Sequence, residues 1–250
     1  MKIFRSCLLA LALFTCPVAH ASQTQAQTPK GELRVLFIGN SLTYANDLPT
    51  IVEALAEASK QKRFIHQSVA LPNFSLQDQW ERGEAQKVIA QGKWDVVVLQ
   101  QGPSGLEESR QSLLEYTRRF ADKIRAAGAK PALYMVWPSE PRFNDFERVV
   151  ESYKLAAAEV KGILLPVGQA WREAWKRDAK LPLYAEDRFH PSVTGSYLAA
   201  LVIYEKLFGA SAIGLPTSLR LRSKALDKIA LTKEQAALLQ TAASEANKKF

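Results

Sequence analysis

A serine and, far from it in the chain, an aspartate and a histidine have the side chains that nucleophilic catalysis requires. Ser41 lies in the segment GNSLT (39–43), directly after an apolar run that predicts a buried strand. Asp187 and His190 are three residues apart, so one short turn can present both on the same side. A carboxylate that holds an imidazole fixes its tautomer and stabilises the imidazolium, as a serine nucleophile requires. Each motif alone also fits local capping or hydrogen bonding, and together they favour catalysis.

Two neutral amides end a second apolar run. Gln100 and Gln101 follow the segment WDVVVL (94–99), which predicts a central strand. A carboxamide that donates to a reacting carbonyl is a known part of an oxyanion hole, and the amides at a helix start near Ser41 can serve the same purpose. The alternative is that the two glutamines bond to loop backbone, because buried amides need partners.

The histidines narrow the chemistry further. The chain has three, and His20 lies in a segment that we expect to be removed. His66 and His190 remain, and we expect His66, in or just before a weak strand, to be structural. Three histidine ligands for a metal are therefore excluded. A zinc site of two histidines and carboxylates is not excluded, but no HExxH spacing is present. The chain also lacks phosphate-binding glycine motifs, so no cofactor is implied. It lacks a GxSxG elbow as well, so an α/β-hydrolase arrangement is not favoured.

The first 21 residues have the features of a secretory signal peptide. Lys2 and Arg5 precede an apolar stretch over 7–18, and residues 19–21 supply small side chains at the usual cleavage spacing. The apolar stretch is shorter than the roughly 20 residues that a membrane span needs. We therefore expect cleavage after Ala21 and a periplasmic or secreted protein. The mature chain should consist of a flexible leader over 22–30 and one domain over 31–250.

Both cysteines lie inside this expected signal peptide. Removal of Cys7 and Cys16 leaves no cysteine in the mature chain, which excludes disulfides, cysteine-ligated zinc and a cysteine nucleophile. Lipidation of Cys16 is an alternative, although Phe14 and Thr15 are poor neighbours for a lipidated cysteine. An uncleaved anchor is the other alternative.

Composition limits the class of protein and its partners. The chain has 250 residues, of which 47% are hydrophobic and 23% charged, and these values exclude collagen-like, disordered and polytopic membrane proteins. The formal net charge is +8, but no run of five or more Lys or Arg occurs. A nucleic-acid partner is therefore not indicated, and we expect a small-molecule or carbohydrate ester as the substrate.

Apolar runs and helical periodicities alternate along the chain. Strands are expected over 32–39, 64–71, 94–99, 131–137 and 162–167. Helices are expected over 48–60, 78–91 with Asp78 as N-cap, 107–127, 143–160, 191–208 with Pro191 in the first turn, and from a capping box at 232–235 to about 248. Residues 219–224 read as a surface connection. This alternation predicts a doubly wound α/β domain with a parallel sheet covered on both faces.

The chemical motifs resemble the signature blocks of the SGNH (GDSL-type) hydrolases. Ser41 matches the nucleophile of the first block, in which Asn40 replaces the usual aspartate, and Asp187 and His190 match the last block. The resemblance covers about 36–209 and is closest to a bacterial branch with GNS(F/L)T, VVLQ and DRFHPS segments. It implies a flavodoxin-like α/β/α sandwich of about five parallel strands in the order 2-1-3-4-5, and ester hydrolysis without a metal.

Two blocks depart from the common family pattern. Where the second block has glycine, Asn73 is the best match, because asparagine tolerates a positive φ. Where the third block has asparagine, the chain has Gln100 and Gln101. The resemblance thus implies an oxyanion hole formed by the Ser41 amide, the Asn73 amide and one glutamine side chain.

Aromatic residues near the expected strand ends suggest a carbohydrate substrate. These residues are Tyr44, Trp80, Trp137, Tyr184 and Phe189, and packing of the loops explains most of them equally well. We expect Asn40, Tyr44 and Trp137 to contact the substrate. The leading hypothesis is a serine esterase that acts through an acyl-enzyme, with an O-acetyl group on a carbohydrate as substrate. The alternatives are a non-catalytic envelope protein that binds a glycan or acyl ligand, and an O-acyltransferase with the same triad.

Overall fold

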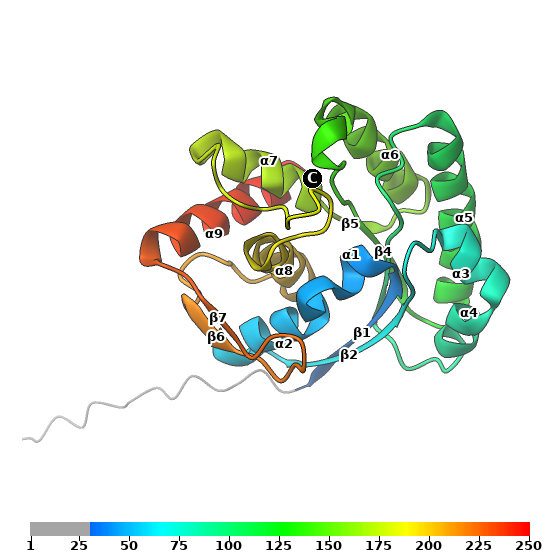
Figure 1. Cartoon of the computed structure of the whole chain (residues 1–250). Helices are drawn as coiled ribbons and strands as arrows, with labels where there is room; N and C mark the ends of the chain where they lie inside the picture. The colour runs from blue at the N-terminus through cyan, green and yellow to red at the C-terminus, as the bar shows by residue number, and fades with distance from the viewer. Residues whose placement is uncertain (1–30) are drawn as a thin grey trace, which may run out of the picture.

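Residues 31–250 are described by the structure, which is a computed structural model (Figure 1). The predictions of a signal peptide and of a leader, with Cys7 and Cys16, concern residues outside this range. Inside it, every helix is too short or too polar to span a bilayer.

Five parallel strands form the central sheet, in the order β2-β1-β3-β4-β5. The strands are β1 (Glu32–Gly39), β2 (Arg63–Ala70), β3 (Val96–Leu99), β4 (Lys130–Tyr134) and β5 (Ile163–Leu165). β1 and β3 lie inside the sheet and are continuously apolar where they pair, because helices cover both of their faces. The α/β class and the strand order implied by the family resemblance are both confirmed.

Helices form a layer on each side of the sheet (Figure 1). They are α1 (Ser41–Tyr44), α2 (Leu48–Ala58), α3 (Leu76–Arg82), α4 (Glu84–Ile89), α5 (Glu107–Ala126), α6 (Phe146–Glu159), α7 (Val167–Arg177), α8 (Val193–Phe208) and α9 (Lys233–Lys248), with 3-10 turns over Ala45–Asp47 and Glu140–Asp145. Helices α3 to α6 pack together on one side, and α2, α7, α8 and α9 on the other.

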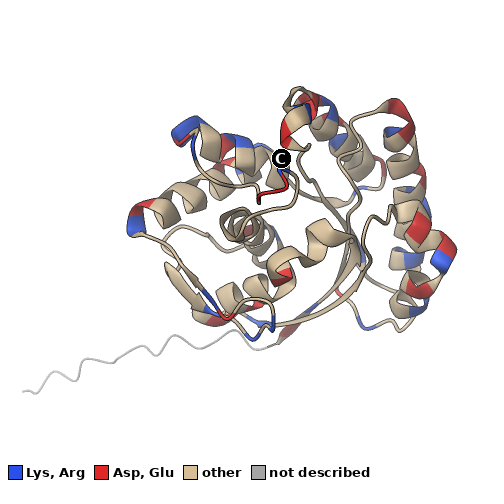
Figure 2. Ribbon diagram, in the orientation of Figure 1, with Lys and Arg blue, Asp and Glu red and all other residues tan. Residues whose placement is uncertain are grey.

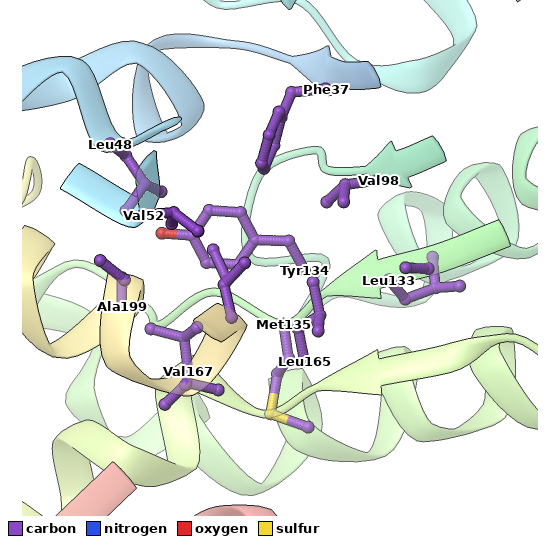
Figure 3. Close-up of a cluster of buried hydrophobic side chains, with 14 of the residues drawn as sticks. Phe37, Leu48, Val52, Val98, Leu133, Tyr134, Met135, Leu165, Val167 and Ala199 are labelled. Atoms are coloured by element: carbon purple, nitrogen blue, oxygen red, sulfur yellow. The ribbon is translucent and has the colours of Figure 1, made fainter. Parts of the chain in front are cut away.

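The core between the sheet and the second helical layer holds large apolar side chains. Phe37 of β1 and Tyr134 of β4 face Val52 of α2 and Ala199 of α8, and all four are buried (Figure 3). Burial of one such large side chain stabilises the fold by about 1.5–3 kcal/mol. This packing fixes the C-terminal ends of β1 and β4, from which the loops of the candidate site begin.

The helix expected over 78–91 is two helices. Gly83, with a φ of 77°, ends α3 and begins α4, so the helical periodicity continues across a break in the backbone. The N-cap is Ser75 and not Asp78. The Ser75 hydroxyl accepts from the Asp78 N–H, and the Asp78 carboxylate accepts from the Ser75 N–H, which is a capping box.

Other expected boundaries also need correction. Pro191 precedes α8, because Ser192 is the N-cap and its hydroxyl accepts from the Gly195 N–H. Helix α7 was not expected, because it begins directly after β5 without a side-chain cap. Part of the expected surface connection over 219–224 is β6 (Ser218–Arg220), which pairs antiparallel with β7 (Lys228–Ala230). Strands of three residues are too short to show a period in the sequence.

Helix α7 approaches the chain beyond β4 closely at Gly168. A Cβ added there would lie 2.2 Å from the Val136 carbonyl oxygen, which is backbone and cannot yield like a side-chain tip. We expect Gly168→Ala to lower the free energy of unfolding by about 1–3 kcal/mol, measured by urea denaturation. Gly102→Ala is the control, because a Cβ there meets nothing within 4 Å. Equal losses in both variants would contradict the close approach.

Candidate active site

The turn that carries Ser41 begins where β1 ends. Asn40 is the N-cap of α1, and its Oδ1 accepts from the Leu42 N–H at 3.1 Å. The Asn40 Nδ2 donates to the Phe74 carbonyl at 3.0 Å, which ties this turn to the loop after β2. Asn40 therefore holds Ser41 at the C-terminal edge of the sheet, where open α/β folds bind their ligands.

Gln100, at the end of β3, supports the same turn from beneath. Its Oε1 accepts from the Asn40 N–H at 2.9 Å and from the Thr43 hydroxyl at 2.7 Å. A Cβ at Gly39 would lie 2.4 Å from this oxygen, so only glycine permits the approach. The two central strand ends are thus locked together beside the nucleophile.

His190 bonds to both Ser41 and Asp187. Its Nε2 lies 2.8 Å from the Ser41 Oγ, and its Nδ1 lies 2.5 Å from the Asp187 Oδ2. An ionised carboxylate accepts from Nδ1–H, and this tautomer leaves Nε2 free to accept the serine proton. The hydrogen bond from His190 lowers the pKa of the Asp187 carboxyl below its usual range, so the carboxylate form is favoured.

The second oxygen of Asp187 shapes the turn itself. Its Oδ1 accepts from the Phe189 N–H at 3.0 Å and from the His190 N–H at 2.9 Å. The turn closes where the Ala185 N–H donates to the His190 carbonyl at 2.8 Å. One carboxylate therefore folds the loop and orients the imidazole that the loop carries.

Asn46 connects the serine turn to the histidine loop. Its Nδ2 donates to the Pro191 carbonyl at 3.0 Å and to the Ser196 hydroxyl at 2.9 Å. Asn46 has a φ of 52°, a left-handed conformation that asparagine tolerates better than most residues. This contact could not be predicted from the sequence, because Asn46 belongs to no motif.

Two backbone amides beside Ser41 are available to a ligand. The N–H groups of Ser41 and Asn73 have no acceptor within residues 31–250, and both residues line the same pocket. Asn73 has a φ of 60°, the glycine-like conformation expected of it. The two amides have the chemistry of an oxyanion hole.

The expected glutamine donors are already used by the protein. Gln100 is fully buried, and its Nε2 donates to the Gln101 carbonyl at 2.6 Å. The Gln101 Nε2 donates to the Ser104 hydroxyl at 2.8 Å and to the Ser109 carbonyl at 3.1 Å. The structure therefore does not support a glutamine side chain as oxyanion donor. The alternative role, bonding within the surrounding loops, describes both residues.

The aromatic residues expected near the substrate are mostly packing residues. Trp137 is fully buried, stacks on Trp171 at a centroid distance of 3.6 Å, and donates its Nε1–H to the Phe189 carbonyl at 2.9 Å. It supports the histidine loop from behind and cannot contact a substrate directly, which corrects the expectation. Tyr44 is 40% exposed but does not line the pocket. Trp80 packs edge-on against Phe120.

The pocket beside Ser41 has a volume of about 670 Å³. It is lined by residues that follow β1, β2, β3 and β4 and by Phe189 of the histidine loop. Asn40 lines it, as expected of a substrate-binding residue, although its amide group serves the Ser41 turn. Ser139 and Arg142 also line the pocket, and the sequence analysis missed both because they lie in a short 3-10 segment without a motif.

Gln100 provides a direct test of how the Ser41 turn is held. In Gln100→Leu, the Asn40 N–H and the Thr43 hydroxyl lose their buried acceptor, and we expect the free energy of unfolding to fall by about 2–4 kcal/mol. Urea denaturation measures the change. Gln111→Leu is the control, because Gln111 bonds only to Glu107 on the exposed face of α5, and should shift stability by less than about 0.5 kcal/mol. Similar losses in both variants would show that Gln100 does not hold the turn.

The chain is similar to several proteins of known structure. No protein-family model matches the chain, and no curated protein matches it. Among solved structures, a protein assigned to the SGNH hydrolases from Slackia heliotrinireducens is 30% identical, with a TM-score of 0.59, and the match covers 70% of this chain and 99% of that one.

Two further structures are similar at lower identity. A DUF4886 family protein from Bacteroides uniformis is 20% identical, has a TM-score of 0.70, and is matched over 86% of this chain and 95% of its own. An acetylxylan esterase from Geobacillus stearothermophilus is 18% identical and has a TM-score of 0.56. The match covers 70% of this chain and 94% of that one. Both share the fold. On the likeness to the Slackia protein, the chain belongs to the SGNH hydrolase superfamily.

Proposed function

We propose that this protein is a serine esterase that hydrolyses a carboxylic ester through an acyl-enzyme. The observation that carries the proposal is the hydrogen-bonded series from the Ser41 Oγ through His190 to Asp187. Membership of a hydrolase superfamily supports the same reaction class. A protein that only binds a ligand requires neither of these two contacts, so they argue against the non-catalytic alternative.

In the first half of the reaction, Ser41 attacks the ester carbonyl. His190 accepts the serine proton at Nε2, while the Asp187 carboxylate holds the ring and stabilises its positive charge. The Ser41 and Asn73 N–H groups bind the oxyanion of the tetrahedral intermediate. His190 then gives its proton to the departing alcohol, and the acyl group stays on the Ser41 Oγ.

In the second half, water replaces the alcohol. His190 takes a proton from the water as it attacks the acyl carbonyl, and the same two amides bind the second oxyanion. Collapse of this intermediate releases the carboxylic acid and returns the proton from His190 to Ser41. An acyltransferase would admit an acceptor hydroxyl in place of water, and product analysis with added sugar or alcohol distinguishes the two outcomes.

The substrate that we propose is an acetyl ester on a carbohydrate. The similar structures include acetylxylan esterases, and the pocket carries several hydroxyl groups that suit a polar substrate. Export by the expected signal peptide would place the enzyme where it meets extracellular or envelope glycans.

Replacement of the nucleophile tests the reaction class. We expect Ser41→Ala, in a protein of residues 22–250, to lower kcat by at least ~10³-fold, because the residual amides alone cannot supply a covalent route. The assay follows release of 4-nitrophenol from its acetate and butyrate esters. Ser223→Ala serves as the control, because Ser223 is a partly exposed serine outside the pocket. A Ser41→Ala enzyme that keeps most of its activity would overturn the proposal.

Replacement of the carboxylate tests the role of Asp187. Asparagine keeps the size of the side chain but favours the wrong imidazole tautomer, so we expect Asp187→Asn to reduce kcat by about 10²–10⁴-fold. Because the native contact lowers the pKa of Asp187, its contribution to stability is present above the usual aspartate pKa and is lost as pH falls through the lowered value. The stability difference between the two proteins should therefore disappear in strong acid. A kcat within tenfold of wild type at neutral pH would exclude this role.

A further inference from the structure

We propose that Arg142 and Ser139 form an anion-binding subsite in the Ser41 pocket, and that the natural ester carries a carboxylate or another oxyanion. The inference rests on the proposed function, because it assigns the substrate class of the same site. It is carried by the position of one guanidinium, by its excess charge, and by one hydroxyl without a partner.

Both residues belong to the segment that follows β4. Ser139 precedes the 3-10 turn Glu140–Asp145, and the Arg142 N–H donates to the Ser139 carbonyl at 2.9 Å. This turn brings the two side chains to the wall of the pocket that also contains Ser41. A group bound there would belong to the same molecule as the ester.

The charge of Arg142 is not fully compensated. Its Nε donates to the Asp145 Oδ2 at 2.8 Å, while Arg148 donates to the other oxygen of the same carboxylate. One negative charge thus faces two positive ones. Glu140, the nearest acid along the segment, is paired with Arg188 and does not balance the excess.

The remainder of the pocket lining is uncharged. Most Lys, Arg, Asp and Glu residues lie on the outer helices (Figure 2). Among the described residues that line the pocket, Arg142 and Asp145 alone carry charge. The Arg142 side chain is half exposed, and the ion pair with Asp145 holds its planar guanidinium in place.

Ser139 supplies a second donor. Within residues 31–250, the Ser139 hydroxyl has no hydrogen-bond partner, and it makes no cap to the turn that follows it. By contrast, the hydroxyls of Ser75, Ser104 and Ser109 in the same pocket bond to neighbouring protein groups. A guanidinium and a free hydroxyl on one turn are a suitable pair of donors for the oxygens of an oxyanion.

The test compares esters that differ in one carboxylate. On the acyl side, 4-nitrophenyl butyrate is paired with the 4-nitrophenyl monoester of succinate. On the alcohol side, phenyl acetate is paired with 3-acetoxybenzoate. The ratio of kcat/KM for the anionic ester over the neutral one cancels any general loss of activity, and Ser41→Ala protein supplies the background rate.

We expect Arg142→Gln to lower this ratio by about five- to tenfold for at least one pair, because a charge-assisted hydrogen bond is lost. Arg142→Lys should restore part of it, and Ser139→Ala should lower it less. Arg222→Gln is the matched control: it removes an equal charge from an exposed ion pair with Glu57, and Arg222 does not line the pocket. Its ratio should stay within about twofold of wild type, because an exposed charge at that distance is screened.

The outcomes separate this inference from the proposed function. If Ser41-dependent turnover is present but Arg142→Gln leaves the anionic-to-neutral kcat/KM ratio unchanged for both pairs, the subsite alone is overturned. Absence of any Ser41-dependent turnover would overturn the proposed function instead. In that case, calorimetry with 3-hydroxybenzoate tests the subsite directly: binding to wild type should be tighter than to Arg142→Gln and should weaken with salt, and equal binding would refute it.

Discussion

The carboxamide of Gln100 is the contact on which the rest of the candidate site depends. It lies fully buried between the ends of the two central strands, and it accepts from the backbone and the side chain of the turn that carries the serine. Inside a protein such a bond is stronger than in water, and its loss leaves donors that no water can reach. The Gln100 carboxamide can approach the end of β1 only because residue 39 is glycine. Any side chain at position 39 would occupy the space of the carboxamide oxygen.

The family motifs identified the serine, the histidine and the aspartate correctly as residues that meet in space, because their types and spacing are local properties of the chain. The left-handed backbone of Asn73 was also predictable, since few residues adopt it. The role of the glutamines could not be predicted from the sequence, for a physical reason. Whether a carboxamide faces a substrate or the protein depends on which partners the fold brings to it, and Ser104, Ser109 and Leu76 reach Gln101 from other loops.

Secondary-structure elements with a local signal in the sequence are predictable, and elements without one are not. Strands that are buried on both faces read as continuous apolar runs, so β1 and β3 are evident. Helix α7 begins at Val167 directly from the strand before it and has no capping side chain, so no start signal marks it. The pocket residues Ser139 and Arg142 lie in a short turn whose position is determined by contacts with the histidine loop, such as the bond from the Glu140 N–H to the Arg188 carbonyl.

The bonds from Asn46 to Pro191 and Ser196 have a consequence for how the protein acquires activity. They join the first crossover of the fold to the segment that follows the last strand of the sheet, across about 150 positions of the chain. Contacts of such long sequence separation form late, because loop closure must precede them. A growing or partly folded chain therefore contains a serine without its base, and the site comes into existence only when α8 docks beside α2.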